Sequence, residues 1–261
     1  MAANVGTEIT LASGALVTVN ADGSYDYDPN GQYEALGAGE TAMDSFTYTI
    51  DDGNGGTDMA TVNITIDGVN APPVAENDFE QVGENTAITE NVFTDNDNGV
   101  DSDIDGDTLT VTEVNGATIA SGGVIPLPSG ALLTINSDGS YIYNPNNQFE
   151  DLQLGETTTD SFTYTIDDGN GGTSEATVAI TILGVNDNPI AENNAETLNA
   201  DQVLSDNMIT DVDSVDGADS DPEGDMLVVT SINGTTLIDG STITLPSGAL
   251  LTVNDLSLIH I

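Results

Sequence analysis

The chain contains no lysine, no arginine, no cysteine and no tryptophan among its 261 residues. Against these absences stand 45 aspartate and glutamate residues, so the formal net charge is -45 at pH 7. Phosphate binding depends on lysine and arginine, which excludes nucleic acid as a partner, and an anionic membrane surface is disfavoured for the same reason. Because self-repulsion of this size opposes a compact state, the fold must depend on cations from its surroundings.

The missing features also limit the class of protein. Without cysteine there is no disulfide framework. No apolar run approaches the ~18 residues that cross a bilayer, so we expect no membrane insertion in this stretch. The opening residues, MAANVGTEIT, lack the charged and apolar regions of a signal peptide. Any export signal or anchor is therefore expected to lie outside this sequence.

Internal repetition is the strongest signal that is present. The segment LASGALVTVNADGSYDYDPNGQYE at 11–34 returns as LPSGALLTINSDGSYIYNPNNQFE at 127–150, an offset of 116 residues (127 minus 11). The segment DSFTYTIDDGNGGT at 44–57 returns unchanged at 160–173. A third copy carries LPSGALLTVN at 245–254, now offset by 118 residues (245 minus 127) because an acidic loop is longer. The chain is therefore built from tandem repeats.

The alignment of the copies predicts the domain boundaries. Residues 1–70 correspond to the C-terminal part of a repeat, residues 71–186 to one complete repeat, and residues 187–254 to the N-terminal part of a third. The last seven residues, DLSLIHI at 255–261, depart from the pattern and resemble a cloning or sequencing-adapter scar. We set this tail aside, together with its lone histidine, His260.

Alternation with a period of two predicts strands. In DSFTYTI, Phe46, Tyr48 and Ile50 share one face, and after the DDGNGG turn the apolar residues alternate again, which indicates a hairpin with one buried side. No apolar stripe has helical spacing. About seven short strands per repeat are typical of an immunoglobulin-like β-sandwich, so we predict an all-β chain of tandem sandwiches whose first and last copies are incomplete. Disorder, the alternative for so acidic a chain, is disfavoured by its 38% hydrophobic residues.

A second hairpin is predicted around the turn at 137–139, and it carries tyrosines on alternate positions. Two interpretations are open for these side chains. They can form a platform for sugar binding, or they can pack in the core, which the alternation favours. The residues concerned are Tyr25, Tyr27, Tyr141 and Tyr143.

Two acidic loops have the composition of calcium sites. Calcium takes six to eight oxygen ligands from carboxylates, amides and backbone carbonyls, and alternate acids in a turn can direct their carboxylates at one centre. A glycine in each loop permits the turn. The candidate ligands are Asp101, Asp103, Asp105 and Asp107 in DSDIDGD and Asp219, Asp221, Glu223 and Asp225 in DSDPEGD. The alternative is that these acids form only a solvated surface.

The motif FTYTIDDGNGGT and the residues that follow it resemble the bacterial VCBS repeat, a cadherin-like module of very large surface and secreted adhesins. Residues 39–70 and 155–189 carry the resemblance. It implies an extracellular or cell-surface adhesin stalk that binds calcium between its domains, with neighbouring repeats of the same chain as partners and a host or biofilm surface ligand as the target. The glycine-rich nonapeptides of toxin-type β-rolls are absent.

The resemblance also implies ligands at the linkers between repeats. The segment GVNDNPIAEN is similar to the Asn-Asp-Asn junction of cadherins, whereas the first linker has Ala71 and Pro72 in place of the aspartate and second asparagine, so we expect it to bind ions more weakly. The DDGNGG turn has an alternative role as a hairpin turn alone. The implied ligands are Asn186, Asp187 and Asn188 in the second linker, Glu76 and Glu192 beyond the linkers, and Asp167 and Glu156 from the complete repeat.

Three functions compete on this evidence. The favoured one is a calcium-stiffened extender that contributes to cell adhesion. The alternative is a ligand-binding adhesin module that recognises a glycan or a protein. An enzyme such as a two-carboxylate glycosidase is disfavoured, because the same acids recur in each repeat and suit a repeated structural role.

Overall fold

The computed structural model describes residues 5–94, 98–120, 122–210, 217–238, 240–254 and 258–260. These residues form strands, turns and loops and contain no helix, as the sequence predicts, and thus no helix that is long and apolar enough to span a membrane. The chain divides into two compact units. Unit 1 comprises residues 1–81, 87–144 and 159–181, and unit 2 comprises 82–86, 145–158 and 182–261.

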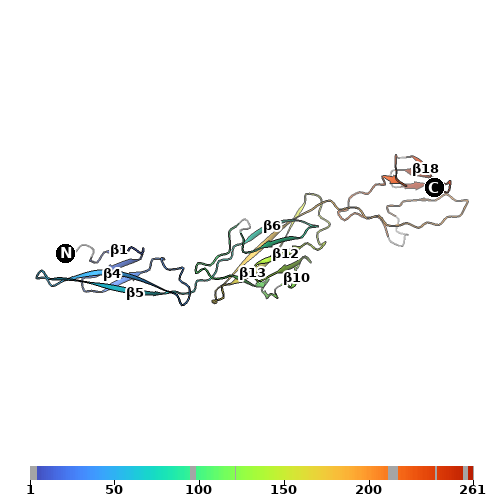
Figure 1. Ribbon diagram of the computed structural model, residues 1–261. Helices are drawn as coiled ribbons and strands as arrows, with labels where there is room; N and C mark the ends of the chain where they lie inside the picture. The colour runs from blue at the N-terminus through green and yellow to red at the C-terminus, as the bar shows by residue number, and fades with distance from the viewer. Residues whose placement is uncertain are drawn as a thin grey trace. The chain divides into compact units, whose positions relative to one another are not determined.

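The first partial repeat lies in unit 1 and forms two small antiparallel sheets. The long hairpin pairs along its full length, from Thr41 with Asp67 to Asp51 with Thr57, and its turn contains glycines at positive φ. Figure 1 draws this hairpin in blue to cyan. One sheet contains β1 (Glu8–Thr10), β2 (Leu16–Val19) and β3 (Tyr25–Asp28), and the other contains β4 (Thr41–Asp51) and β5 (Thr57–Asp67).

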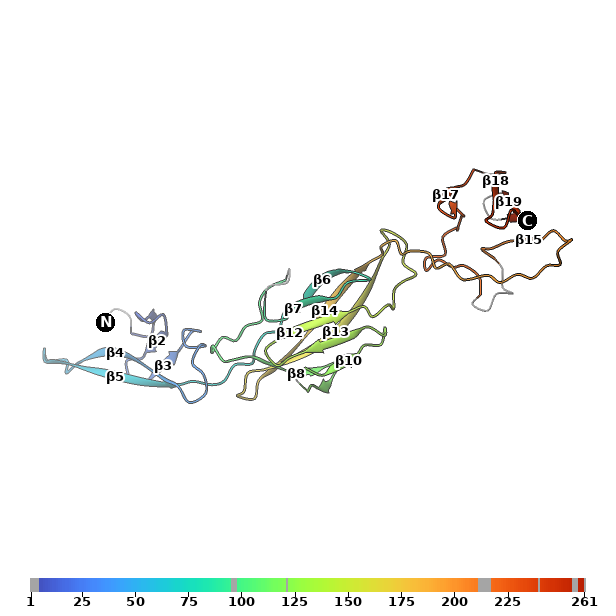
Figure 2. The same cartoon turned by 45° about the vertical axis from the view of Figure 1, so that its right-hand side comes forward.

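The complete repeat has nine strands in two sheets (Figure 2). The count exceeds the expected seven because β9 and β10 are only two and three residues long. The four-stranded sheet has the order β10-β11-β12-β7 and the five-stranded sheet the order β6-β14-β13-β8-β9. The strands are β6 (Asp78–Gly83), β7 (Ile88–Asn91), β8 (Thr110–Val114), β9 (Ala117–Thr118), β10 (Val124–Pro126), β11 (Leu132–Ile135), β12 (Ser140–Asn144), β13 (Thr157–Asp167) and β14 (Thr173–Leu183).

Aromatic side chains dominate the core of the complete repeat. Tyr141 and Tyr143 are almost fully buried, which confirms the packing interpretation for these two residues. The ring of Tyr141 meets Phe162 edge-on at a centroid distance of 5.5 Å. The hydroxyl of Tyr143 donates to Asp160 Oδ2 at 2.8 Å, and the hydroxyl of Ser129 donates to the same oxygen at 2.6 Å. The phenol of Tyr143 is therefore buried with its hydrogen bond satisfied.

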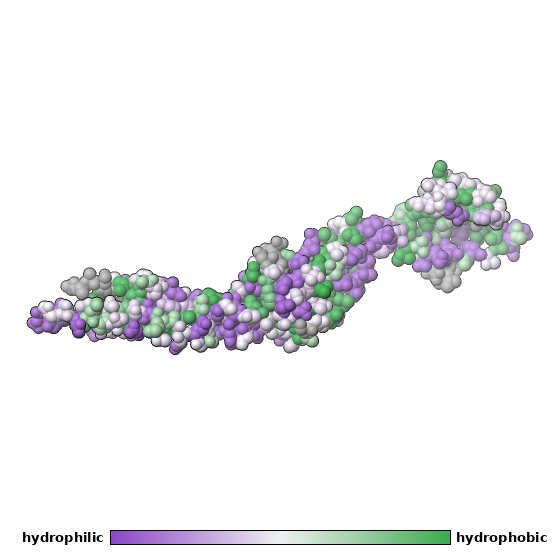
Figure 3. All heavy atoms as spheres, in the orientation of Figure 1, coloured by the Kyte–Doolittle hydropathy of each residue, from purple (hydrophilic) through white to green (hydrophobic). Residues whose placement is uncertain are grey.

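The corresponding hairpin of the first repeat is much more exposed. In the complete repeat Tyr164 and Ile166 are fully buried, whereas their counterparts Tyr48 and Ile50 are 41% and 60% exposed. The prediction that these two side chains face a buried side is therefore wrong for the first copy. The reason is that β4 and β5 pair only with each other within the described residues, so they lack the neighbours that β6 and β8 are to β14 and β13. Hydrophobic residues accordingly reach the surface in this part of the chain (Figure 3).

The third repeat belongs to unit 2 and forms short strands that match those of the complete repeat in position. Sheet order is β15-β20-β19-β18, with β16 and β17 paired separately. Part of the tail that we set aside is a strand, β20, because an extended segment can pair with an open sheet edge; residues 255–257 and 261 lie outside the described residues. The strands are β15 (Ser205–Asp206), β16 (Ser231–Ile232), β17 (Thr235–Thr236), β18 (Thr242–Thr244), β19 (Leu250–Asn254) and β20 (Leu258–His260).

Candidate metal centres

The two acidic loops fold by the same set of hydrogen bonds. In the first loop, Asp103 Oδ1 accepts the backbone N–H groups of Asp105 at 2.9 Å and Asp107 at 3.3 Å. Gly106 completes the turn at a φ of 80°, a conformation that favours glycine. The loop thus bends around Asp103 and brings the Asp107 carboxylate close to it. The second loop repeats this arrangement, with Asp221 Oδ1 accepting from Glu223 and Asp225.

Centre 1 lies in unit 1 and comprises Asp103, Asp107 and Asp168. One carboxylate oxygen of each residue lies within 4.8 Å of the others. Asp103 and Asp107 come from the acidic loop, and Asp168 comes from the DDGNGG turn between β13 and β14. Three carboxylates this close repel one another unless a cation or protons lie between them.

Asp168 is held in place as a carboxylate. It is only 4% exposed, and its Oδ2 accepts a hydrogen bond at 2.8 Å from the side-chain amide of Asn70 in the first linker. This bond, supported by the backbone N–H groups of Asn170 and Gly172, keeps the pKa of Asp168 below its ordinary value. A side chain at Gly172 would collide with the Asp168 carboxylate and with Pro72 Cα, 2.8 Å away. The turn therefore needs a glycine here to approach both groups.

Several oxygens around centre 1 lack a hydrogen-bond donor. Among the described residues, Asp103 Oδ2, Asp105 Oδ1 and Asn70 Oδ1 are buried without a partner. Buried polar atoms are normally satisfied, and an exception calls for a missing group. Carboxylate and amide oxygens can be satisfied by a cation as well as by a donor. The donor set is the one that calcium prefers.

Centre 2 lies in unit 2 and comprises Glu84, Asp187 and Glu223, again with carboxylate oxygens within 4.8 Å of one another. Glu84 is 1% exposed and accepts the Val185 N–H at 2.7 Å through Oε1. Glu223 Oε1 accepts the Asp187 N–H at 2.6 Å, and Asp187 Oδ1 accepts the amide of Asn85 at 2.8 Å. Each acid is thus oriented by one hydrogen bond.

The second oxygen of each acid in centre 2 is buried without a donor among the described residues. The three carboxylates therefore face one another, and one oxygen of each accepts no hydrogen bond. Burial raises the pKa of Glu84, and the charges of Asp187 and Glu223 raise it further. Burial likewise raises the pKa of the neighbouring Glu150, and the charges of Asp187 and Glu84 raise it further. With no lysine or arginine in the sequence, a cation or bound protons must relieve this repulsion.

The structure brings together four of the predicted ligands, Asp103 and Asp107 in centre 1 and Asp187 and Glu223 in centre 2. Asp105 adjoins centre 1, where its Oδ2 accepts the N–H of Ala71 at 2.8 Å. The other predicted ligands have different contacts. Asp101 accepts from the Tyr164 hydroxyl and the Glu76 N–H, Asp219 accepts from the Glu192 N–H, Asp221 and Asp225 share the loop bond described above, Asp167 accepts from the Gly169 N–H, Glu156 accepts from the Gln153 N–H, Asn186 donates to the Asp187 carbonyl, and Asn188 is exposed.

Sequence reasoning missed two members of the centres. The resemblance implies Asp167 as the ligand from the DDGNGG turn, whereas Asp168 is the member of centre 1. Glu84 was not considered. The sequence signal for Glu84 is a charged residue at an apolar position of a strand pattern. Val82 and Glu84 share one face of β6 and its continuation, and both are buried. A charged residue at a core position of a strand pattern marks such a site.

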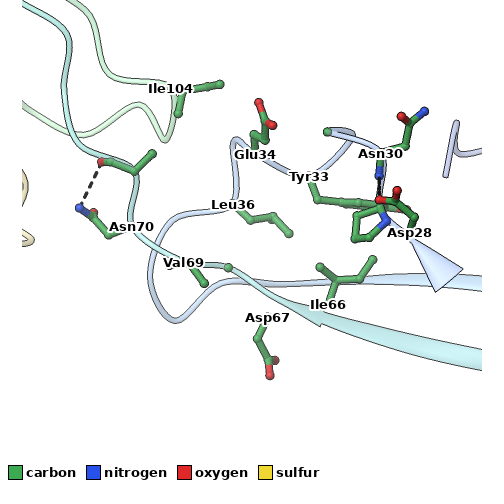
Figure 4. Close-up of a pocket in the computed structure, with 14 residues that line it drawn as sticks. Asp28, Asn30, Tyr33, Glu34, Leu36, Ile66, Asp67, Val69, Asn70 and Ile104 are labelled. Carbon is green, nitrogen blue, oxygen red and sulfur yellow. Dashed lines mark hydrogen bonds between the residues drawn. The ribbon is translucent and has the colours of Figure 1, made fainter. Parts of the chain in front are cut away.

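The first linker lacks the equivalent of centre 2. Ala71 occupies the position of Asp187, and its N–H still bonds the acidic loop, but it offers no carboxylate. Leu36, Val69 and Ile104 instead line a cavity beside the linker, with Glu34 at its edge (Figure 4). Weaker ion binding by the first linker remains a prediction, since centre 1 holds three acids of its own.

In calcium-free buffer, the unfolding temperature should fall as the pH rises above 4.5, through the raised pKa values of Glu84 and Glu150. The raised pKa values of Glu84 and Glu150 mean that the folded state binds protons above 4.5, where the unfolded chain releases them. This stabilisation is complete below 4.5 and is lost as the pH rises through the folded pKa values. The lowered pKa of Asp168 has the opposite effect, but only as the pH falls below 3.8.

Circular dichroism melts after dialysis against a chelating resin would measure this dependence. Saturating calcium should flatten it, because the ion replaces the bound protons. A melting temperature that rises over the same interval would contradict the crowding of acids in centre 2.

Several known proteins are similar to this chain. Calcium-binding lectin RapA2 of Rhizobium johnstonii is 29% identical over 176 residues, which cover 64% of this chain and 70% of that protein. Among solved structures, PcdhgB3 EC1-4 aligns with 94% of this chain and 56% of its own, at 16% identity and a TM-score of 0.39. Human mucin-like protocadherin EC1-2 aligns with 48% of this chain and 61% of its own, at 14% identity and a TM-score of 0.28. The chain thus spans less than two thirds of either structure.

The chain matches the family model of the bacterial cadherin-like domain over residues 2–68 and 70–184. These two stretches cover the first partial repeat and almost all of the complete one. The resemblance drawn from the repeated motifs is confirmed, and the chain belongs to the bacterial cadherin-like domain family.

Proposed function

We propose that this chain is a calcium-stiffened extender of a bacterial surface or secreted adhesin, and that it contributes to cell adhesion by holding a distal binding domain away from the cell. Its immediate partners are neighbouring repeats of the same array, and its location is extracellular. The matching family is one of cadherin-like domains, which supports a non-enzymatic role.

The observation that carries the proposal is the set of buried oxygens without donors beside the two linkers. Asp187 belongs to the second linker, and an ion bound to centre 2 would tie it to Glu84 of the complete repeat and to Glu223 of the next acidic loop. In the first linker, Asn70 bonds the Asp168 carboxylate of centre 1. A cation in either place restricts the backbone dihedrals of a linker, and this is what stiffening means in physical terms.

Calcium is the preferred ion for these centres on chemical grounds. Carboxylate and amide oxygens form the whole donor set, and no cysteine is present to favour a softer metal. The relative RapA2 is named as a calcium-binding protein, which supports the same choice. With calcium at about 100 times the dissociation constant, each centre would add about 2.7 kcal/mol to the free energy of unfolding.

Small-angle scattering of the full chain tests the extender role. With millimolar calcium we expect a larger maximum dimension and a larger radius of gyration than after addition of chelator. Calcium titration by calorimetry, run in parallel, separates two failures. Binding without a change in scattering would leave calcium as a folding ligand and remove the stiffening role, whereas an absence of binding would remove the metal centres as well.

A second function, recognition of a glycan or protein ligand, is favoured by one observation. The relative RapA2 is named as a lectin. A measurable affinity of this chain for a polysaccharide on a glycan array would support it, and binding that survives loss of both centres would place the ligand elsewhere on the repeats.

A further inference from the structure

The outer face of the four-stranded sheet in the complete repeat carries no acidic residue, although the chain has 45 acids. The buried Leu133 and Tyr141 identify the core side of this sheet, so the residues that alternate with them point away from the core. The outward residues, which we call the neutral face, are Thr89 and Asn91 of β7, Val124 and Pro126 of β10, Leu132 and Thr134 of β11, and Ser140, Ile142 and Asn144 of β12.

The centre of the neutral face is apolar. Thr134 pairs with Val124 on one side and with Ile142 on the other. Val124 is 63% exposed and Ile142 is 46% exposed. In the next row, the half-buried Leu132 pairs with the exposed Pro126. Four apolar side chains thus surround one threonine on a surface that water reaches, and grouped apolar side chains of this kind mark contact sites.

The same positions of the first copy are acidic. With the repeat offset of 116 residues, Val124 corresponds to Glu8 (124 minus 8) and Ile142 to Asp26 (142 minus 26). Glu8 and Asp26 pair with Thr18 just as Val124 and Ile142 pair with Thr134. These strands therefore pair in the same way with acids at both positions. Since folding does not require apolar side chains there, their presence in the complete repeat points to a contact.

The charge of the neutral face selects its partner. A basic partner would be attracted to the acids on the rest of the chain and would find no carboxylate here. A sugar would find no aromatic ring to stack on, because Tyr141 and Tyr143 point into the core. A second copy of this chain is repelled wherever carboxylates face carboxylates, and it can approach where they are missing.

We infer that two copies of this chain associate side by side through the neutral face of the complete repeat. Both copies use the same surface, so the contact is isologous and closes as a dimer. Sheets pack face to face at about 10 Å, a distance at which Val124, Leu132 and Ile142 of the two copies interdigitate. This lateral contact goes beyond the proposed extender role and does not require it.

The size of the neutral face makes the contact weak. Four strands at ~4.8 Å spacing and about five residues at ~3.3 Å each cover about 300 Å². A stable interface buries about 800 Å² on each partner. The dimer should therefore form only at high protein concentration.

Ionic strength should control this association in a characteristic direction. Each copy carries a net charge of -45, and the screening length is about 30 Å at 0.01 M salt and about 8 Å at 0.15 M salt. The acids that surround the neutral face therefore repel the second copy strongly at low salt and much less at physiological salt. The dimer should strengthen as salt is added, whereas an association driven by opposite charges would weaken.

Sedimentation equilibrium of the full chain in physiological salt tests the inference. We expect the weight-average mass to rise from 26.8 kDa toward twice that value, and not beyond it, as the concentration increases. Ile142→Asp and Val124→Glu should each abolish this rise, because they introduce the acids that the first copy has at these positions. The control Phe79→Asp adds the same charge at a 52% exposed residue of β6, in the other sheet, and should associate like the original chain.

The measurement is repeated with millimolar calcium, because an ion that bridges acids of two copies would also raise the mass. Such bridging would not respond to Ile142→Asp. The inference is overturned if the original chain stays monomeric at every concentration and salt level, if its mass passes that of a dimer, or if Ile142→Asp and Val124→Glu associate as strongly as Phe79→Asp. It is also overturned if the original chain stays monomeric and binds dextran, a neutral polysaccharide, through Ile142, since the face then belongs to a glycan.

Discussion

Removal of calcium from the full chain should lower the temperature of thermal unfolding by about 5 to 10 °C for each centre that is emptied. The estimate combines about 2.7 kcal/mol for a site at about 100 times its dissociation constant with about 2 to 4 °C per kcal/mol for a protein of this size. The physical reason is that centres 1 and 2 each hold three acids within 4.8 Å, and no cationic side chain can compensate them.

Far-ultraviolet circular dichroism would follow this unfolding, because the chain has no tryptophan to report on its core. Adding calcium back in excess of the chelator should restore the original transition, which controls for damage by the reagent. Sodium chloride at equal ionic strength should restore only part of it, since screening does not replace coordination. Superimposable melting curves with calcium and with chelator would leave the acids as a solvated surface.

The substitution Glu84→Gln should have opposite effects in the two conditions. In chelator it removes a buried negative charge from beside Asp187 and Glu223, while the new side-chain oxygen can still accept the Val185 N–H. The unfolding temperature should then equal or exceed that of the original chain. In calcium the same variant loses a ligand of centre 2, and the unfolding temperature should be about 5 to 10 °C lower.

The control for this variant is Glu90→Gln, which makes the same chemical change at an exposed position of β7. It should shift both transitions slightly and in the same direction, because it only reduces the net charge. If Glu84→Gln behaves like the control, then centre 2 does not bind calcium through Glu84. If Glu84→Gln is strongly destabilised in chelator as well, the role of Glu84 is structural.

Local patterns were sufficient to predict most of the fold. Alternation and turn residues identify both long hairpins, and the structure pairs β4 with β5 in the register that the DDGNGG turn sets and places β13 next to β14. The repeat offset predicts that the copies share their strands, which they do except at β6, whose counterpart at 194–199 in the third repeat forms no strand. These features depend on neighbours within a few residues, and the sequence shows such neighbours directly.

The exposure of the first hairpin could not be predicted in the same way. Tyr48 and Tyr164 occupy identical sequence contexts, yet one is 41% exposed and the other is buried. What differs is the presence of a neighbouring strand, β8, whose Val114 pairs with Tyr164 from 50 positions away along the chain (164 minus 114). A short pattern contains no information about such a partner.

The metal centres were predicted in part for a related reason. The acidic loop supplies Asp103 and Asp107 from one turn, so their proximity follows from their spacing. Glu84 reaches Asp187 only because the strands bring together residues that are about 100 positions apart, and the choice between Asp167 and Asp168 depends on the amide of Asn70, which is equally remote. Spacing alone does not determine contacts of this range.

The close approach of the β13–β14 turn to the first linker has a consequence for how such arrays can diverge. Any side chain at position 172 would push against both the Asp168 carboxylate and Pro72. Insertions are accepted in the acidic loop, whose lengthening changes the offset of the third copy from 116 to 118 residues (245 minus 127). The turn DDGNGG, by contrast, has the same length and residues in both copies that include it. Copies that differ in the length of the acidic loop can therefore follow one another along the array, while the turn that contacts the start of the next copy stays constant.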